Sequence, residues 1–357
     1  MTNKSRNPAS EDGSSWSSGL VHIANAQVQV LPLKGDQLMR RLVILLLTLS
    51  WLVPNVGCQR GTNTVSDKPT IALVLKTLNN PFFIDMKKGA EDAAQRLGVQ
   101  LIVQAAEREV DVDKQMQIIE NLIQTRVAAL CVTPSGSKEV VPAIVKANRA
   151  NLPVVIVDTR VDAPALNAAG GHVGSFIGSD NFEGGKLAGE FIAKRLEGKG
   201  KVAILEGIPG HETGDSRLKG FHSALAAHPG IQVVASQTAN WERDQGYNVF
   251  QNILQSHPDV QALFACSDLM ALGAVEAIAA AKKTGNIVVV GFDAFSEARE
   301  AVIKGTMLAT IAQSPYEMGS RAVENATRLL KGEKVEEDIS VKIQLITKEN
   351  AAGEASK

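Results

Sequence analysis

The residues of this chain that are best suited to bind a polar ligand stand directly after predicted β-strands. The carboxyl ends of parallel strands meet at one edge of a sheet, so side chains that follow different strands can face the same ligand. Two carboxylates, one guanidinium, two amides and three aromatic rings converge on the predicted edge. The candidate ligand-binding residues are Lys76, Asn80, Phe82, Phe83, Thr133, Asp158, Arg217, Trp241, Ser267, Asp293 and Gln313.

This set of side chains matches the surface of a sugar. Every sugar hydroxyl both donates and accepts hydrogen bonds, and the ring has one or two apolar C–H faces that an aromatic side chain can cover. Carboxylates accept from neighbouring hydroxyls, Arg and Lys donate, and Asn and Gln do both. A charge-assisted hydrogen bond contributes about 1.5–3 kcal/mol. Half a dozen of them with two stacked rings suffice for a micromolar complex, which needs roughly −8 kcal/mol net.

Several candidates also have an ordinary structural interpretation. The first predicted helix opens with Asn80 as its cap and Pro81 at its first position, and it stops at Gly98. Phe83 fits the apolar stripe of this helix, whereas Phe82 does not. Trp241 could serve packing alone, and Arg217 lies within a predicted helix, where exposed arginines are common.

The aspartates could be helix caps, because Asp between a strand and a helix often caps that helix. This interpretation applies to Asp158 and Asp293, although a loop over residues 159–164 follows Asp158 and weakens it there. Asp268 begins a strongly helical run over residues 270–281, and we interpret it mainly as a cap.

We find no pattern that predicts catalysis, a cofactor or a metal. The loop Gly207-Ile208-Pro209-Gly210 follows a strand, but its spacing fits neither nucleotide fingerprint, and Pro209 lacks the N–H that a phosphate would need. The six His residues show no metal spacing. No Ser or Cys sits in a recognisable nucleophile elbow. We therefore expect no enzyme.

The elements that must position these residues alternate between strands and helices. Strands alternating with helices imply parallel sheets covered on both faces, and a Gly-rich break over residues 168–174 implies two doubly wound α/β lobes. A helix beginning near Pro315 and a final strand over residues 341–346 are left over, and they could return to the first lobe. Strands are predicted at 70–75, 101–104, 127–132 and 153–158, and then at 176–179, 201–205, 232–236, 262–265, 287–292 and 307–312.

Composition and charge narrow the class of protein. The chain has 357 residues, 45% of them hydrophobic and 21% charged, which excludes wholesale disorder and allows two domains. Its net charge is −1, with both signs mixed along the chain. A nucleic-acid-binding protein needs a basic face, so we expect no nucleic-acid partner.

The N-terminal region predicts export. Arg40 and Arg41 precede an apolar run over residues 42–53, which is too short for a comfortable membrane span, and small residues precede Cys58. We interpret residues 39–58 as a lipoprotein-type signal peptide whose Cys58 is acylated. We interpret residues 1–38 as a non-native or disordered extension.

One alternative stays open for the signal, a tether is predicted after it, and two cysteines further along are predicted to be buried. Asn55 stands where a lipoprotein signal prefers Leu, so an ordinary cleaved signal with an incidental Cys58 stays open. Residues 59–69 are polar and predict a flexible tether to the folded part. Cys131 and Cys266 lie in apolar runs typical of buried thiols, and no disulfide framework is apparent.

Seven short segments of the chain resemble periplasmic ribose- and allose-binding proteins, and the resemblance covers about residues 68–348. It implies two Rossmann-like lobes joined by a three-stranded hinge (a periplasmic binding protein of type I), with a sugar held between them for an ABC importer. The segments are LKTLNNPFF at 75–83, DMKKG at 85–89, SDN at 179–181, GDSR at 214–217, SDLMALG at 267–273, VGFD at 290–293 and TIAQ at 310–313.

The resemblance also implies boundaries. The N-terminal lobe is expected over residues 70–179 plus 314–342, and the C-terminal lobe over 180–313 plus 343–350, with a tail at 351–357. We expect an extracytoplasmic monomer that is attached to the membrane by its lipid alone and that docks on a permease.

Individual positions bear on which sugar is bound. By the resemblance, Lys76 and Trp241 look more like the allose type, because the ribose type has a small hydroxyl residue and Phe there. Two departures matter: Ser267 stands where the family commonly has Asn, and Thr133 where the ribose type has Asn. A shorter hydroxyl leaves room or a bridging water, so the class of ligand is predicted but the identity of the sugar is not.

Three rival functions remain to be weighed. A sensor with the same lobes would present the sugar or a signal molecule to a membrane receptor kinase. A transcriptional repressor would need a helix-turn-helix ahead of the first strand, where an export signal stands instead. An NAD-dependent enzyme would bind nucleotide.

Overall fold

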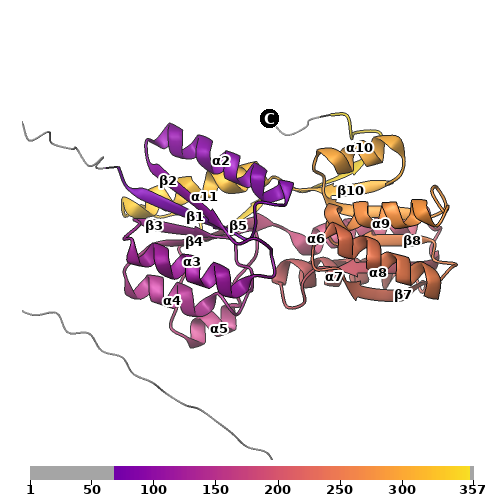
Figure 1. The fold of residues 1–357 in the computed structure, drawn as a ribbon, viewed down its shortest axis with the longest axis horizontal. Helices are drawn as coiled ribbons and strands as arrows, with labels where there is room; N and C mark the ends of the chain where they lie inside the picture. The colour runs from indigo at the N-terminus through magenta and orange to yellow at the C-terminus, as the bar shows by residue number, and fades with distance from the viewer. Residues whose placement is uncertain (1–67, 354–357) are drawn as a thin grey trace, which may run out of the picture. The chain divides into compact units, whose positions relative to one another are not determined.

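The structure is a computed structural model that describes residues 68–353. The extension over residues 1–38, the signal over 39–58 with Cys58, most of the tether over 59–69 and the end of the tail lie outside the described residues. Within them, strands and helices alternate, as Figure 1 shows.

The first series of elements builds the first lobe. Helices α2 and α11 cover one face of its sheet, and α3, α4 and α5 cover the other (Figure 1). The elements are β1 (Thr70–Leu75), α2 (Pro81–Leu97), β2 (Gln100–Ala105), α3 (Val112–Gln124), β3 (Ala129–Val132), α4 (Val141–Arg149), β4 (Val154–Val157), α5 (Ala163–Ala168), β5 (Ser175–Ser179), α11 (Pro315–Leu330) and β11 (Asp338–Val341).

The second series builds the second lobe on the same plan. Helix α6 packs against α7, and α8 packs against α9. The elements are α6 (Asn181–Arg195), β6 (Lys199–Glu206), α7 (Glu212–Leu225), β7 (Gly230–Thr238), α8 (Arg243–Ser256), β8 (Ala262–Ala265), α9 (Asp268–Ala280), β9 (Val288–Asp293), α10 (Ser296–Lys304), β10 (Ala309–Ala312) and β12 (Gln344–Thr347).

Each lobe has one six-stranded sheet. The strand order is β11-β5-β4-β3-β1-β2 in the first and β12-β10-β9-β8-β6-β7 in the second. All pairings are parallel except that of β10 with β12. The order reverses beside β1 and beside β6, and such reversals are where doubly wound sheets bind ligands. The predicted fold class is thus confirmed.

The chain passes three times between the two sheets. It does so after β5, after β10 and after β11. The third passage shows that one sequence expectation was wrong: the single strand expected at residues 341–346 is two short strands in different sheets. The separation falls at Lys342 and Ile343, between the end of β11 and the start of β12.

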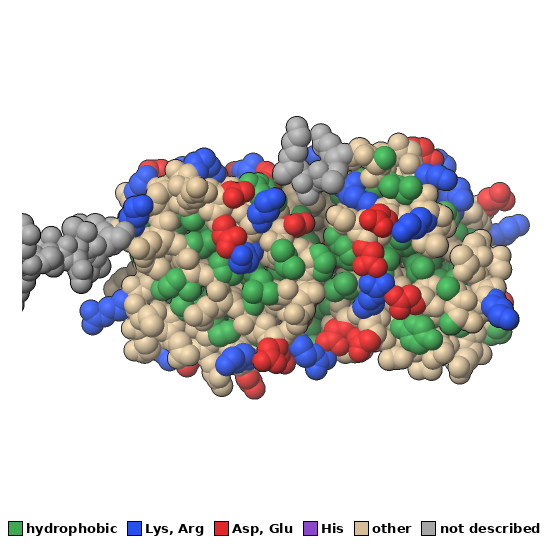
Figure 2. Space-filling model, turned by 45° about the horizontal axis from the view of Figure 1, so that its top comes forward, with side chains coloured by type: hydrophobic (Ala, Val, Ile, Leu, Met, Phe, Trp, Pro, Cys, Tyr) green, Lys and Arg blue, Asp and Glu red, His purple; other side chains and the backbone are tan. Residues whose placement is uncertain are grey.

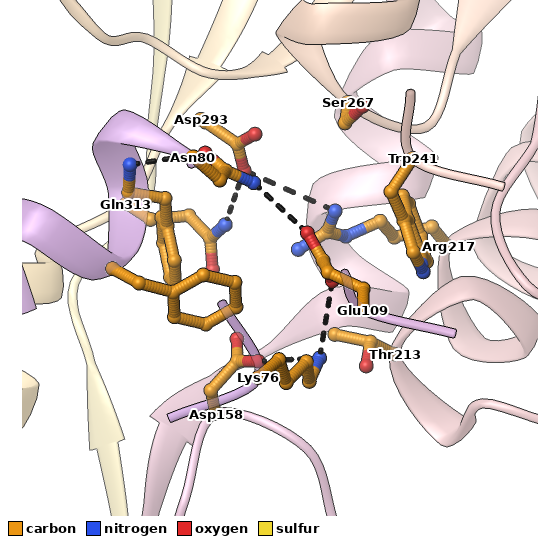
Figure 3. A pocket seen from close by; sticks show the side chains of 12 residues that line it. Lys76, Asn80, Glu109, Asp158, Thr213, Arg217, Trp241, Ser267, Asp293 and Gln313 are labelled. Carbon is orange, nitrogen blue, oxygen red and sulfur yellow. Dashed lines mark hydrogen bonds and ion pairs between the residues drawn. The ribbon is translucent and has the colours of Figure 1, made fainter. Parts of the chain in front are cut away.

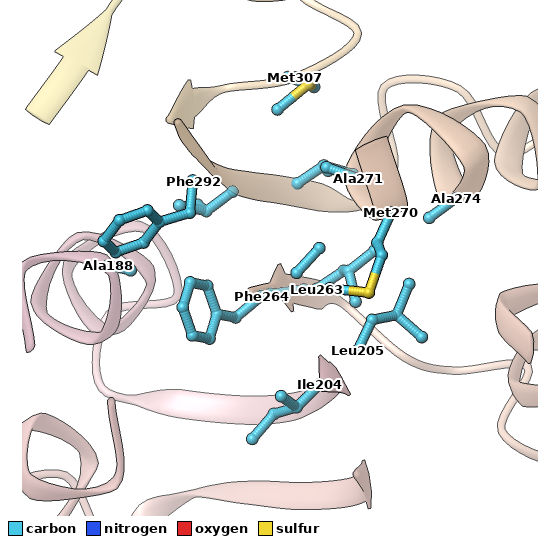
Figure 4. Packing of buried hydrophobic residues seen from close by; sticks show 14 of the residues in the cluster. Ala188, Ile204, Leu205, Leu263, Phe264, Met270, Ala271, Ala274, Phe292 and Met307 are labelled. Carbon is cyan, nitrogen blue, oxygen red and sulfur yellow. The ribbon is translucent and has the colours of Figure 1, made fainter. Parts of the chain in front are cut away.

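The core forms because the central strands are apolar on both faces. In β1, Ile71, Leu73 and Leu75 point into one hydrophobic cluster of the first lobe, while Ala72 and Val74 point into the other. In the second lobe, the cluster in Figure 4 packs side chains of the sheet against helix residues. Phe264 and Phe292 are fully buried there, as are Met270 and Met307.

Helix α2 follows its sequence signals closely. The Asn80 side chain accepts a hydrogen bond from the Phe82 backbone N–H at 3.0 Å, and Pro81 occupies the first turn. Gly98 ends the helix in a left-handed conformation with φ 70°. The expected cap, first-turn proline and glycine stop are confirmed. The cap places Asn80 and the two phenylalanines at the carboxyl end of β1, where the candidate site lies.

Candidate functional site

A cavity lies between the two lobes at the carboxyl ends of their central strands. About 320 Å³ of its volume is not filled by protein atoms. This figure includes open solvent at the mouth of the cavity, and the space open to the centres of water-sized molecules is about 30 Å³. Figure 3 shows side chains from both lobes pointing into it. The lining residues are Lys76, Asn80, Phe82, Phe83, Glu109, Asp158, Thr213, Arg217, Trp241, Ser267, Asp293 and Gln313.

On the first-lobe side, a buried lysine organises the polar groups. Lys76 follows β1 directly, and its Nζ donates to the Asp158 carboxylate at 3.0 Å and to the Thr159 hydroxyl at 2.7 Å. Asp158 follows β4 with φ 65°, a left-handed conformation that is uncommon for a side chain other than Gly. Its carboxylate is held by Lys76 and by Thr159, and it does not cap α5, because Asp162 does.

A second carboxylate, which the sequence analysis missed, stands beside that lysine. Glu109 lies 3.9 Å from Lys76 Nζ and accepts a hydrogen bond from the Asn80 amide at 3.1 Å. Burial raises the pKa of Glu109, and the nearby Lys76 charge partly offsets this. Asn80 thus uses its oxygen to cap α2 and its amide to hold Glu109 in the cavity.

On the second-lobe side, Arg217 of α7 is buried and tightly held. Its Nε donates to the Asn181 side-chain oxygen at 2.9 Å, and its Nη1 donates to the Cys266 carbonyl at 2.6 Å. The guanidinium lies 3.7 Å from the ring centre of Phe292, which is a cation–π arrangement. Its Nη1 is also 4.0 Å from Asp293. These contacts hold the guanidinium at the wall of the cavity.

Asp293 and Gln313 form a bonded pair at the ends of β9 and β10. Gln313 donates its amide N–H to the Asp293 carboxylate at 2.7 Å. Gln313 Oε1 is buried and has no hydrogen-bond partner among residues 68–353, so one acceptor remains for a ligand hydroxyl. Burial raises the pKa of Asp293 well above its ordinary value, and the Arg217 charge opposes this.

The turn that presents Asp293 is held by a buried carboxylate behind it. Asp293 has φ 125° and Ala294 has φ 58°. The backbone is therefore in the sterically costly left-handed region at both residues. Asp268 accepts from the Ala294 backbone N–H at 2.6 Å and from the Thr310 hydroxyl at 2.7 Å. Burial raises the pKa of Asp268 to about 7.

This geometry corrects the cap interpretation of Asp268. The residue that caps α9 is Ser267, whose side chain accepts from the Met270 backbone N–H at 3.4 Å. Asp268 sits one position later, is fully buried, and bonds to the turn after β9 instead. Asp293 caps no helix either, because the residue before α10 is Phe295.

Aromatic rings line the cavity from both lobes. Phe82 and Phe83 meet edge to face with ring centres 5.2 Å apart, a favourable geometry for two aromatic rings. Trp241 belongs to the second lobe and has φ 66°. A Cβ on Gly207 would lie 1.9 Å from the Trp241 ring, so glycine at that position makes room for the indole. The loop that superficially suggested phosphate binding therefore accommodates a tryptophan.

The structure brings ten of the eleven candidate residues to this one cavity, and Thr133 is the exception. Thr133 is fully buried, and its hydroxyl donates to the Val74 carbonyl at 3.1 Å within the sheet. The short threonine side chain bonds to this neighbouring carbonyl, so its hydroxyl does not line the cavity. That the ten residues bind a ligand stays a prediction.

Glu109 and Thr213 line the cavity but were not among the candidates. Glu109 follows β2, so the rule that ligand-binding residues stand after the strands of a parallel sheet also predicts it. Thr213 sits in the first turn of α7, and its position carries no separate signal in the sequence.

Other classes of site find no support in the part of the chain that the structure describes. No group of His, Cys, Asp and Glu residues within 68–353 could hold a metal ion. Cys131 and Cys266 are free and buried, and burial raises the pKa of each thiol to about 12. No helix among these residues is both long and apolar enough to span a bilayer. On the face in Figure 2, basic and acidic side chains are interspersed.

Two doubly wound lobes with a polar and aromatic cavity between them define a two-lobed ligand-binding protein. The model of the periplasmic binding protein domain matches residues 71–334, and the chain belongs to this family. It is 43% identical over 282 residues to the ribose import binding protein RbsB of Escherichia coli, covering 79% of this chain and 92% of that protein.

Two further relatives are informative. The D-allose-binding periplasmic protein of Escherichia coli is 38% identical over 254 residues, covering 71% of this chain and 82% of that protein. The crystal structure of an ABC transporter periplasmic solute-binding protein from Actinobacillus succinogenes with bound D-allose is similar to the described fold. It has a TM-score of 0.75 and 40% sequence identity, and the match covers 80% of this chain and 99% of that one.

Proposed function

We propose that this protein captures a monosaccharide, an allose- or ribose-like pyranose, between its two lobes and delivers it to an ABC import permease. The observation that carries the proposal is the cavity, in which buried acceptors and donors from both lobes surround a space flanked by aromatic rings. Relatives named for ribose and for D-allose support the ligand class. The relative solved with D-allose supports it as well.

The polar groups are matched to a ring of hydroxyls. Asp158, Asp293 and Glu109 supply carboxylate oxygens, while Lys76 and Arg217 supply charged donors. Because these groups already bond to each other, they are held in place before a sugar arrives, and the ordering cost of binding is reduced. Such a site binds sugars of one stereochemistry more tightly than their epimers, because a misplaced hydroxyl leaves a buried group unpaired.

The ligand class is tested with a thermal-shift panel of pentoses, hexoses and polyols on the purified protein. We expect D-allose or D-ribose to raise the melting temperature, because a ligand that binds only the folded state stabilises it. NAD and a non-sugar metabolite serve as controls. No shift with any monosaccharide would remove the proposed function.

We propose export and lipid attachment through Cys58 as the setting of this function. The motif around Cys58 supports it, and the substitution Cys58→Ser tests it. The wild-type protein is expected in the membrane fraction of the producing cells, and the variant in the soluble fraction. Equal fractionation of the two would mean that Cys58 is not an anchor.

Delivery to a permease is distinguished from presentation to a receptor kinase by uptake. Cells that express the protein with its neighbouring permease are expected to import the sugar, and cells that lack the binding protein are not. Unchanged uptake together with a sugar-dependent kinase response would favour the sensor.

A further inference from the structure

His211 bridges the two lobes beside the cavity. It lies directly before α7 in the second lobe and is 2% exposed. Its Nε2 is 2.6 Å from the carbonyl oxygen of Ser135, which belongs to the first lobe. On its other side, the Trp241 indole N–H points at His211 Nδ1 with a separation of 3.4 Å. The ring thus touches both the opposite lobe and an aromatic residue of the cavity.

The two partners fix the protonation state of this ring. A carbonyl oxygen can only accept, so His211 Nε2 must carry a proton and donate it to Ser135. An indole N–H can only donate, so His211 Nδ1 must be free to accept from Trp241. Both contacts are satisfied only by the neutral imidazole with its proton on Nε2. A second proton, on Nδ1, would face the indole N–H.

The residues that follow His211 contact the first lobe as well. The Glu212 backbone N–H donates to the Ser137 hydroxyl at 3.2 Å. The hydroxyls of Thr213 and Thr159 are hydrogen-bonded at 2.8 Å, and Thr159 also accepts from Lys76. Three consecutive residues at the start of α7 therefore bond across the cleft, and their bonds can form only when the lobes are closed.

We propose that His211 is a positioning residue that couples closure of the lobes to the orientation of Trp241 over the sugar, and that it does so only as the neutral ring. The inference rests on the proposed sugar-binding function. It makes the start of α7, residues 211–213, a latch between the lobes. A second proton on the His211 ring would break the bond from the Trp241 indole N–H and leave the bond to Ser135 in place.

The charges around His211 agree with this role. Burial lowers the pKa of His211 to about 4, and the positive charge of Lys76 acts in the same direction. The Ser135 carbonyl and the Asp158 carboxylate oppose the shift. The carboxylate of Glu212, the residue after His211, accepts a hydrogen bond from the Ser216 hydroxyl of the same helix.

The sign of the pH effect follows from the two states. If the lobes part, the contact with Ser135 is lost and the ring is expected to reach solvent, where the ordinary pKa of a histidine is about 6.5. The closed form holds the pKa lower, so it binds fewer protons and its advantage is complete only above the pKa of the open form. Sugar affinity is expected to fall as the pH drops from about 6.5 towards 4, approaching about tenfold per pH unit.

The experiment measures the dissociation constant of the sugar by calorimetry between pH 4.5 and 8 for four proteins. His211→Phe keeps a ring but loses both bonds, and we expect about ten- to a hundredfold weaker binding at pH 7.5. His211→Gln keeps a donor near Ser135, so it is expected to recover part of the affinity and to lose much of the pH dependence. His222→Gln, on the exposed face of α7, is the matched control and should behave like the wild type.

Glu109 and Asp293 also titrate in the cavity, so the decisive quantity is the difference in slope between the wild type and His211→Gln. Equal slopes, together with unchanged affinity of His211→Phe, would overturn the latch while the proposed function stands. If the wild type binds no sugar, the proposed function fails, and the latch that rests on it fails too. With saturating sugar, a neutral, Nε2-protonated His211 ring at pH 5.5 in the ¹⁵N spectrum would support the latch, and a doubly protonated ring at that pH would overturn it.

Discussion

Asp158 carries much of the first-lobe half of the site. Its carboxylate is buried, and Lys76 and Thr159 both donate to its Oδ2, which holds the group in place and leaves Oδ1 for a sugar hydroxyl. Its left-handed backbone at the end of β4 aims the side chain into the cavity, not along the next helix.

For Asp158→Ala we expect a loss of about 1.5–3 kcal/mol in sugar binding, or roughly 10–150-fold. Lys76 loses its partner in the same variant, which places the expected effect at the upper end of that range. Asp113→Ala, an exposed aspartate of α3, is the control and should leave binding unchanged. Unchanged affinity of Asp158→Ala in calorimetry would take Asp158 out of the site.

Trp241 gives an optical readout, because it is the only tryptophan after residue 58. Its ring lies 5.6 Å from the Arg217 guanidinium and lines the cavity, so a bound sugar changes its surroundings. We expect a sugar-dependent change in tryptophan fluorescence, which Trp241→Phe abolishes while weakening binding. A fluorescence response that survives in Trp241→Phe would locate the reporter outside this cavity.

The turn between β9 and α10 shows how a single element is adjusted for the site. Asp268 holds the Ala294 N–H, and that bond keeps Asp293 in its left-handed conformation. Because burial raises the pKa of Asp268 to about 7, the folded state binds a proton that the unfolded state releases between about pH 4 and 7. Its contribution to stability is therefore complete at low pH and is lost as the pH rises through 7.

For Asp268→Asn we expect a flatter pH dependence of the free energy of unfolding between pH 5 and 8, because the variant has no proton to release. The amide can still accept from Ala294. Asp268→Ala should weaken sugar binding as well, because the Asp293 turn loses its support. Urea denaturation at several pH values checks the first expectation, and an unchanged slope in Asp268→Asn would contradict it.

The sequence predicts elements well where one local rule dominates. Runs of buried apolar residues located the strands, and the Asn-Pro start and Gly end located α2. The single strand expected at 341–346 was wrong because the chain changes sheets at Lys342, which no local pattern marks. The role of Asp268 was missed because its partners, Ala294 and Thr310, are distant in sequence.

The site was predicted to the extent that it follows from sheet topology. Residues at the carboxyl ends of strands in each lobe were expected to converge, and the structure brings them to one cavity. Glu109 obeys the same rule but was not sought. Thr133 obeys the rule too but lies outside the cavity, because its short side chain donates to the Val74 carbonyl within the sheet.

At the level of the whole molecule, two kinds of contact join the lobes. In the latch at residues 211–213, His211 and Thr213 are buried and Glu212 is half-buried. The ion pair between Arg108 and Glu242, at 2.6 Å, is partly exposed. Exposed ion pairs contribute about 0–1 kcal/mol and are screened by salt, so the buried contacts dominate closure.

We therefore expect Arg108→Ala to change sugar affinity by less than about fivefold. Raising the salt concentration should change the wild-type affinity by a similarly small amount. Calorimetry measures both. A large loss of sugar affinity in Arg108→Ala would mean that this exposed ion pair, and not the latch, controls closure.

The central claim is that a monosaccharide is held between the lobes by the residues of this one cavity. The most direct test is a crystal structure of the protein grown with D-allose or D-ribose. We expect one sugar ring between Trp241 and the two phenylalanines, with its hydroxyls within hydrogen-bond distance of Asp158, Asp293 and Arg217. A sugar bound elsewhere, or a saturated crystal with this cavity empty of sugar, would contradict the account.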